Sequence, residues 1–164
     1  MTYNFGSHKI VEFKRAKNFF SKIKKKKKII QCHGVFDLVH PGHIRHFAHC
    51  KSKAEILVVS VTPDIFIKKG TYRPLIPEKM RASNLAALEL VDYVIIDKNK
   101  LPHELLKLIR PNFFAKGMEY FLNPNPLTEK EKQIVEKNGG KMIFSPGDFV
   151  MSSTKLITDS KINL

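Results

Sequence analysis

No apolar run in this chain reaches the roughly 18–20 residues that a membrane-spanning helix needs, and the sequence holds only two cysteines and no tryptophan. The N-terminus also lacks the apolar core of a secretory signal. Cys32 and Cys50 have neither CxxC spacing nor a His-Cys metal spacing, which argues against a disulfide framework and a zinc finger. We therefore expect a cytoplasmic protein with reduced thiols and no membrane partner.

Acidic residues are scarce as well, because 15 Asp and Glu stand against 29 Lys and Arg, a formal net charge of +14. This balance favours polyanionic ligands but does not separate nucleotides from nucleic acid. The lysine run 24–28 suits either a phosphate patch or a solvated helix end. We interpret it as a solvated helix end. A site for single-stranded nucleic acid would need aromatic residues between the lysines for the bases to stack on, and the run contains none. Nucleic acid is therefore not the expected partner.

With 164 residues and 43% hydrophobic content, the chain has the size of one domain with a core of its own. Apolar residues recur at helical spacing from about residue 10 to residue 20. This pattern predicts an N-terminal helix which, with the lysine run, forms a segment 1–28. We expect that segment to pack on the main domain, 29–164.

Short β-branched runs alternate with helical periodicity along the main domain. Strands are predicted at 29–32, 56–61, 93–96, about 112–116 and about 141–144, and helices at about 42–53, 78–90, 102–109, 128–138 and from Ser152. The alternation predicts right-handed βαβ crossovers and an α/β fold with an open, mostly parallel sheet. In such a sheet, ligands bind at the carboxyl ends of the strands. The polar motifs at 34–43, 62–70, 116–120 and 145–154 each follow a predicted strand directly.

The histidine pair in His40-Pro41-Gly42-His43 lies where a helix is expected to begin. Pro41 restricts the backbone and Gly42 allows close approach of a ligand. Two imidazoles beside a helix N-terminus supply hydrogen-bond donors for a phosphate on which charge develops. The alternatives are ordinary capping histidines or a zinc site. Zinc is disfavoured, because a Pro-Gly turn does not match the i, i+4 pairing of zincins and no third ligand is near, so we expect no protein metal ligand.

The stretch Gly34–His43 resembles the GxFDxxHxGH signature of the cytidylyltransferase-like nucleotidyltransferases. The resemblance extends in order over about 29–157, through Val61–Asp64, Lys69-Gly70, Arg73-Pro74, Arg81, Ala86–Val94, Lys116-Gly117 and Ser152–Ile157. It implies a Rossmann-like fold with helices on both faces. From Arg73 to Val94 the chain is most similar to the heptose-phosphate adenylyltransferase branch, as found in proteins that also carry a ribokinase-like sugar kinase.

The resemblance also implies roles for individual residues. It places the backbone of Val35 and Phe36 beside the nucleotide, and His40, Gly42 and His43 on the triphosphate. Lys69 is expected to neutralise the phosphates of either substrate, as a mobile point charge on a loop, and neighbouring Lys68 is an alternative. The catalytic residues implied in this way are His40, His43 and Lys69.

Other implied residues keep two interpretations each. Arg81 either reaches the phosphates or forms a surface ion pair, and Asp37 either orients the acceptor or serves as a turn residue. Lys116 and Gly117 are expected to border the base, with Glu119 where relatives often carry Asp. The three hydroxyls of Ser152, Ser153 and Thr154 suit both a helix cap and the β- and γ-phosphates.

The expected reaction is transfer of a nucleoside monophosphate from ATP or CTP to a sugar or polyol phosphate, with release of pyrophosphate. Gly147 and Glu89 stand where relatives that act on glycerol phosphate carry arginine, which argues against that alternative. The resemblance further implies Mg²⁺, a homodimer and a possible separate sugar kinase. Two alternatives of other classes are a basic nucleic-acid-binding domain and a non-catalytic nucleotide sensor.

Overall fold

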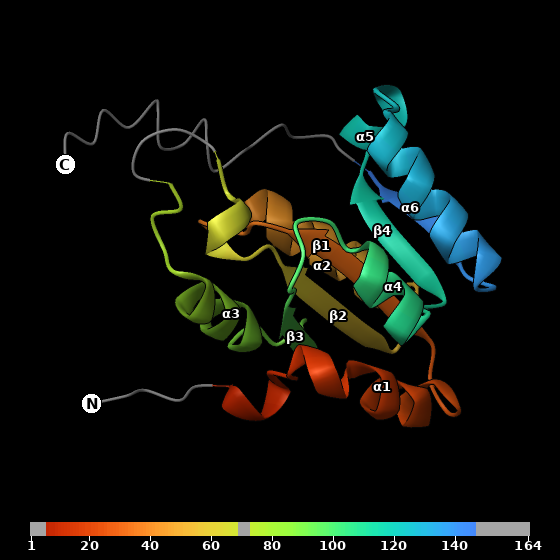
Figure 1. Cartoon of the computed structure of the whole chain (residues 1–164), viewed down its shortest axis with the longest axis horizontal. Coiled ribbons are helices and arrows are strands. Elements are labelled where there is room, and N and C mark those ends of the chain that lie inside the picture. The colour runs from red at the N-terminus through yellow and green to blue at the C-terminus, as the bar shows by residue number, and fades with distance from the viewer. Residues whose placement is uncertain (1–5, 69–72, 147–164) are drawn as a thin grey trace.

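The computed structural model describes residues 6–68 and 73–146 (Figure 1). The predictions for Lys69, Ser152, Ser153 and Thr154 lie outside these described residues, as does the argument from Gly147. The final helix expected from Ser152 lies outside them too.

A single five-stranded sheet forms the centre of the described molecule (Figure 1). Its spatial order is β3-β2-β1-β4-β5, and every pairing is parallel. The strands are β1 (Ile29–Gly34), β2 (Ile56–Val61), β3 (Tyr93–Ile96), β4 (Phe113–Gly117) and β5 (Lys141–Ser145). This confirms the predicted α/β fold. The direction of winding reverses between β1 and β4, so the topological switch point lies there.

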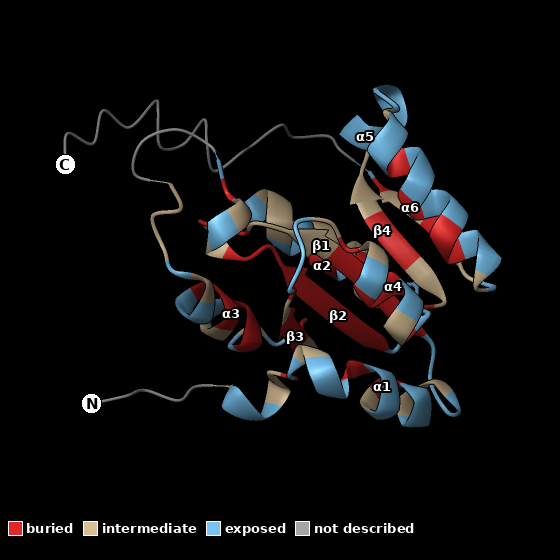
Figure 2. Ribbon diagram, viewed as in Figure 1, coloured by how far each residue is buried: buried red, intermediate tan, exposed pale blue. Residues whose placement is uncertain are grey.

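Helices cover both faces of the sheet, as the apolar clusters show. On one face lie α2 (Pro41–Lys51) and α3 (Glu78–Ala86), and on the other lie α1 (Ala16–Lys24), α4 (His103–Ile109) and α6 (Pro126–Lys137). Figure 2 shows that the burial follows this layering, with the helices exposed only on their outer sides. β2 is buried along its whole length, because it is covered on both faces.

Two helix predictions need correction. The N-terminal helix begins at Ala16, after a 3₁₀ turn at Phe13–Arg15, because Ile10 is extended and forms a parallel bridge to Val94. α3 ends at Ala86 rather than near 90, and the Lys9 ammonium donates to the carbonyl oxygens of Leu88 and Val91 just beyond it.

A short helix α5 (Glu119–Leu122) follows β4 and was not predicted from the sequence. Its four residues are too few to show a helical period. Within residues 6–68 and 73–146, no helix combines the length and the apolar character that crossing a bilayer requires.

Candidate functional site

The loop after β1 brings the histidine motif to the carboxyl edge of the sheet, next to the switch point. Phe36 adopts a left-handed backbone conformation, with φ of 50°, which turns the chain sharply toward α2. The Phe36 ring then packs over Gly34, where a Cβ atom would lie only 3.0 Å from the ring. A side chain at position 34 would press on this ring, which is buried against α2.

His40 is the N-cap of α2, and its imidazole performs the capping. The ring Nδ1 accepts a hydrogen bond from the Gly42 N–H at 3.2 Å. His43 Nδ1 reaches back to the His40 N–H at 3.4 Å, which completes a capping box. Because Nδ1 accepts in both rings, the neutral form of each ring carries its proton on Nε2. The two rings stack with centroids 3.8 Å apart.

Both histidines of the motif are held in their neutral form. Burial lowers the pKa of His43 to about 3, helped by the neighbouring rings of His40 and His46 and opposed by a backbone hydrogen bond with Leu38. Burial also lowers the pKa of His40 below its usual value of 6.5. The pair therefore presents two neutral imidazoles at a helix N-terminus rather than two cations.

A surface pocket opens beside the His40 ring. Its volume is about 500 Å³, and it is lined by Val39, His40, Pro41, Ile44 and Arg45. The cap of α2 therefore borders open space, which a ligand at the helix N-terminus requires.

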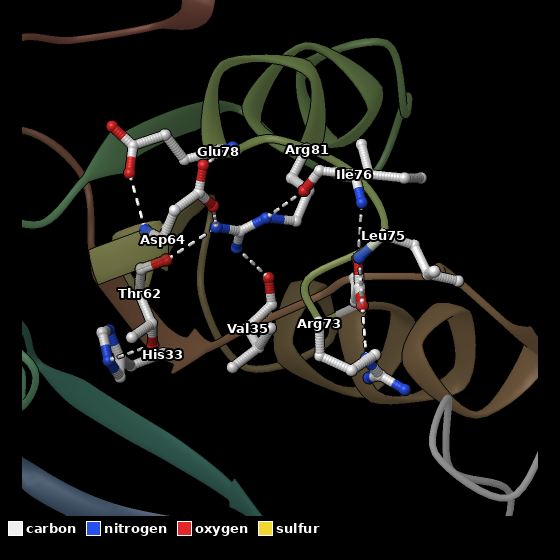
Figure 3. A network of polar contacts seen from close by, with 10 residues as sticks. His33, Val35, Thr62, Asp64, Arg73, Leu75, Ile76, Glu78 and Arg81 are labelled. Carbon is white, nitrogen blue, oxygen red and sulfur yellow. Dashed lines mark hydrogen bonds and ion pairs between the residues drawn. The ribbon is translucent and has the colours of Figure 1, made fainter. Parts of the chain in front are cut away.

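Arg81 of α3 is fully buried and directs its guanidinium to protein oxygens (Figure 3). Its Nη2 donates to the Thr62 carbonyl at 2.9 Å and to Asp64 Oδ1 at 2.6 Å. Its Nε donates to the Ile76 carbonyl at 2.9 Å, and its Nη1 donates to the Val35 carbonyl. Arg81 was expected either to reach the phosphates or to form a surface ion pair. The structure shows an ion pair with Asp64, but the guanidinium is buried. A direct contact with a phosphate would require Arg81 to break these hydrogen bonds.

Asp37 is also occupied by the protein itself. Its carboxylate, which is buried, accepts hydrogen bonds from the backbone N–H groups of Leu75 at 3.1 Å and Ile76 at 2.9 Å. Arg73 Nε lies 2.8 Å from Asp37 Oδ2, as an ion pair whose N–H is not aligned for a hydrogen bond. Asp37 thus connects the histidine loop to the stretch that follows Lys69.

The three residues predicted beside the base come together at the end of β4. The Lys116 ammonium pairs with Glu131 and lies 4.1 Å from the centroid of the Tyr120 ring. The Glu119 carboxylate folds over Gly117, where a Cβ atom would come within 2.1 Å of it. A side chain at position 117 would displace the Glu119 carboxylate, which is the end of a flexible side chain.

One polar network at this edge was missed from the sequence. His33 Nδ1 lies 2.9 Å from Ser60 Oγ, and its Nε2 lies 3.1 Å from Thr62 Oγ1. Ser60 Oγ also donates to the Cys32 carbonyl at 3.2 Å, so the network joins β1 and β2 through hydroxyl and imidazole groups. Burial lowers the pKa of His33 to about 4. The available signal was that Gln31 and His33 are polar at alternate positions of an otherwise apolar strand.

His46 is a second residue that sequence reasoning did not single out. Its Nδ1 lies 2.7 Å from Ser145 Oγ, so it connects α2 to the end of β5. Burial lowers the pKa of His46 to about 4, with a further contribution from His49. The i, i+3 spacing from His43 places it on the same side of α2.

Comparisons with known proteins bear on this arrangement. The cytidylyltransferase-like family model matches residues 31–158. Among curated relatives, the bifunctional protein HldE of Pelobacter propionicus is 36% identical over 118 residues, which is 71% of this chain and 23% of the relative. HldE of Desulfatibacillum aliphaticivorans is 35% identical over 135 residues, or 81% of this chain and 27% of the relative. This chain thus spans about a quarter of the length of these relatives.

Two solved structures share the fold. A lipopolysaccharide core biosynthesis protein from Thermoplasma volcanium aligns with a TM-score of 0.60 at 21% identity, over 73% of this chain and 95% of that one. Pantoate-beta-alanine ligase from Francisella tularensis aligns with a TM-score of 0.61 at 18% identity, over 93% of this chain and 76% of that one. At these identities the likeness concerns the fold alone.

Proposed function

The chain belongs to the cytidylyltransferase-like family, and from this premise we propose that it is a nucleotidyltransferase acting on an NTP and a sugar phosphate. Its similarity to HldE over 71–81% of its length supports this reaction class. The resemblance of residues 73–94 to the heptose-phosphate adenylyltransferase branch favours ATP and a heptose-type phosphate as the substrates. Glu89, which replaces an arginine of the glycerol-phosphate enzymes, is consistent with this choice.

The observation that carries the proposal is the pair of neutral imidazoles at the N-terminus of α2. A phosphate oxygen of the acceptor attacks the α-phosphorus in line, the bond to the β-phosphate oxygen breaks, and pyrophosphate leaves. No covalent enzyme intermediate forms. Because the neutral His40 ring carries its proton on Nε2, it donates to phosphate oxygens on which charge builds, and His43 acts beside it.

Cationic groups must still neutralise the triphosphate. Nucleotidyltransferases of this kind use a divalent metal, and we propose Mg²⁺. Among the described residues, no group of three or more His, Cys, Asp or Glu side chains could hold a metal ion. We propose that the ion is carried mostly by phosphate oxygens and water. Lys69 supplies the remaining charge as the catalytic lysine and contacts the acceptor phosphate.

The other assigned residues shape the nucleotide site. Val35 and Phe36 contact the nucleotide through their backbone, and Gly42 admits the triphosphate at the helix N-terminus. Lys116, Gly117 and Glu119 border the base, and Ser152, Ser153 and Thr154 donate to the β- and γ-phosphates. Arg81 and Asp37 act by holding Val35 and the stretch 73–76 in place.

Two statements about partners belong to this proposal. Because the HldE relatives are bifunctional and several times longer than this chain, a sugar kinase is the expected partner activity. A homodimer is proposed from the family resemblance, and analytical ultracentrifugation tests it.

The deciding experiment is pyrophosphate release with ATP and with CTP, each against a panel of sugar and polyol phosphates. We expect release that depends on one acceptor and that falls by about 10²–10³-fold in His43→Ala. His49→Ala, on the same helix but outside the motif, serves as the matched control and should release pyrophosphate at the wild-type rate.

Other outcomes would select the rival functions. NTP binding without release for any acceptor would indicate a nucleotide sensor. Absent release together with tight, salt-sensitive nucleic-acid binding that survives His43→Ala would indicate a nucleic-acid-binding domain.

A further inference from the structure

Part of the basic excess of the chain lies at the edge of the sheet opposite the candidate site. Because all five strands are parallel, the segments that precede them share one edge. These segments are 24–28, 51–55, 87–92, 110–112 and 136–141, and together they carry ten Lys and Arg against four Asp and Glu. We call this set of segments the amino edge.

Hydrogen bonds hold the segments of the amino edge side by side. The Lys28 carbonyl accepts from the Ile56 N–H at 3.1 Å. Asn112 Oδ1 accepts from the Ile29 N–H at 2.9 Å, and its carbonyl accepts from the Lys141 N–H at 2.9 Å. Segments that come from distant parts of the sequence are therefore held side by side at this edge.

Most of these cations are exposed to solvent. The exposed ones are Lys25, Lys26, Lys27, Lys28, Lys53, Arg110, Lys137 and Lys141. Within the described parts of the chain, none of these eight forms an ion pair. The Glu55 carboxylate interacts electrostatically with Lys27 and Lys28 and accepts from the Lys28 backbone N–H at 3.0 Å, so the protein offsets only part of this charge.

Among the described residues, the carboxyl edge, which holds the candidate site, has no such excess. Its described segments 34–40, 62–68, 73–77, 97–102 and 117–125 carry four Lys and Arg and four Asp and Glu. A strand of six residues separates the two edges by about 20 Å, roughly two Debye lengths at physiological ionic strength. The amino edge therefore contributes little to the binding of a nucleotide, and its charge requires another explanation.

We propose that the amino edge docks the protein on the surface of an anionic lipid bilayer. Clusters of four to eight Lys or Arg are sufficient for such electrostatic attachment, and nine of the ten cations here are lysines, which act as point charges. None of the exposed large hydrophobic side chains of the described residues lies in these segments, so the attachment is electrostatic and reversible.

The composition of this surface favours lipid over nucleic acid. It offers no exposed aromatic ring for base stacking and a single arginine for bidentate contacts. Docking through the amino edge leaves the histidine motif facing the aqueous phase, where soluble substrates arrive. The sequence argument against a membrane partner concerned spanning segments and does not apply to surface attachment.

Co-sedimentation of the full chain with vesicles tests the proposal. We expect binding to vesicles of phosphatidylcholine mixed with phosphatidylglycerol, no binding to phosphatidylcholine alone, and loss of binding as salt is raised. Substitution of Lys25, Lys26, Lys27, Lys28 and Lys53 by Gln should weaken the partition by about ten-fold or more. The matched control replaces five exposed lysines elsewhere, Lys79, Lys98, Lys100, Lys130 and Lys132, by Gln, and should stay within about two-fold of the wild type.

Three results would each overturn the proposal. The first is that the wild type does not bind anionic vesicles at low salt, and the second is that the control variant loses as much vesicle binding as the five-lysine variant. The third is binding to duplex DNA that is tighter than binding to the vesicles and depends on the same five lysines, which would assign the surface to nucleic acid. Pyrophosphate release by the five-lysine variant is measured separately, so failure of this proposal is distinguishable from failure of the proposed reaction.

Discussion

His40 has two separable roles, because different ring nitrogens perform them. Nδ1 caps α2 by accepting from Gly42 N–H at 3.2 Å, and Nε2–H remains as the donor. A substitution that removes only one of these functions therefore distinguishes a structural residue from a catalytic one.

Asn is the substitution that keeps the cap, because its side-chain oxygen is among the best N-cap acceptors. We expect His40→Asn to retain the wild-type free energy of unfolding within about 0.5 kcal/mol and to lose pyrophosphate release by about 10²–10³-fold. His40→Ala should lose the same activity and also about 1 kcal/mol of stability. Urea denaturation and the pyrophosphate assay measure the two effects; full activity in His40→Asn would contradict the donor role.

Partly buried histidines with lowered pKa values make stability depend on pH. The pKa is lowered to about 4 in His33 and His46 and to about 3 in His43, from 6.5 in the unfolded chain. The unfolded state therefore binds more protons below pH 6.5, and stability present above that pH is lost as pH falls toward about 4. We expect the free energy of unfolding to decrease over this window, with a shallower slope in His33→Asn. An unchanged slope in that variant would refute the assignment of His33 as a buried neutral group.

At the scale of elements, Arg81 connects three pieces of backbone that meet only in the folded state. It links α3 to the loop after β1 through Val35, to the end of β2 through Thr62, and to the stretch ahead of its own helix through Ile76. The loop carrying the histidine motif is therefore positioned from the neighbouring crossover.

Replacement of Arg81 by Met should be destabilising by about 3 kcal/mol, because it leaves the carbonyl oxygens of Val35, Thr62 and Ile76 without their donor. Lys79→Met on the exposed side of the same helix is the control and should change stability by about 0.5 kcal/mol or less. Guanidinium denaturation measures both. Equal stability of the two variants would show that the network is not essential to the fold.

At the scale of the whole molecule, α1 packs on the sheet through an aromatic cluster. Phe20 is fully buried, and its ring meets Phe19 and Tyr93 edge to face, with centroids 5.1 and 5.6 Å away. The prediction that segment 1–28 belongs to a single folding unit with the main domain follows from this contact and still requires a test.

Phe20→Ala provides that test. We expect a loss of about 3–5 kcal/mol that shifts the entire unfolding transition, with circular dichroism and tyrosine fluorescence remaining coincident. Lys17→Ala, exposed on the same helix, is the control with little effect. A separate early transition in Phe20→Ala would show that the N-terminal segment unfolds independently.

The strands were predictable to different degrees. The bounds 56–61 and 93–96 agree with β2 and β3, because continuous β-branched runs are typical of strands buried on both faces. β1 extends two residues beyond the expected 29–32, because His33 and Gly34 also pair with β2. A histidine and a glycine do not continue the apolar pattern of the strand, so the sequence did not predict this extension. Pairing across a sheet is a tertiary interaction, and a local pattern does not reveal it.

The sequence by itself determined the parallel α/β architecture and the histidine motif at the start of α2, because strand burial, helix periodicity and capping are properties of adjacent residues. Only the tertiary structure decided the partners of Arg81, the burial of His33 and the gathering of lysines at the amino edge. Arg81 and Val35 lie 46 residues apart in the chain. Their contact depends on the order in which the strands assemble, and strand order is fixed by the packing of the whole sheet.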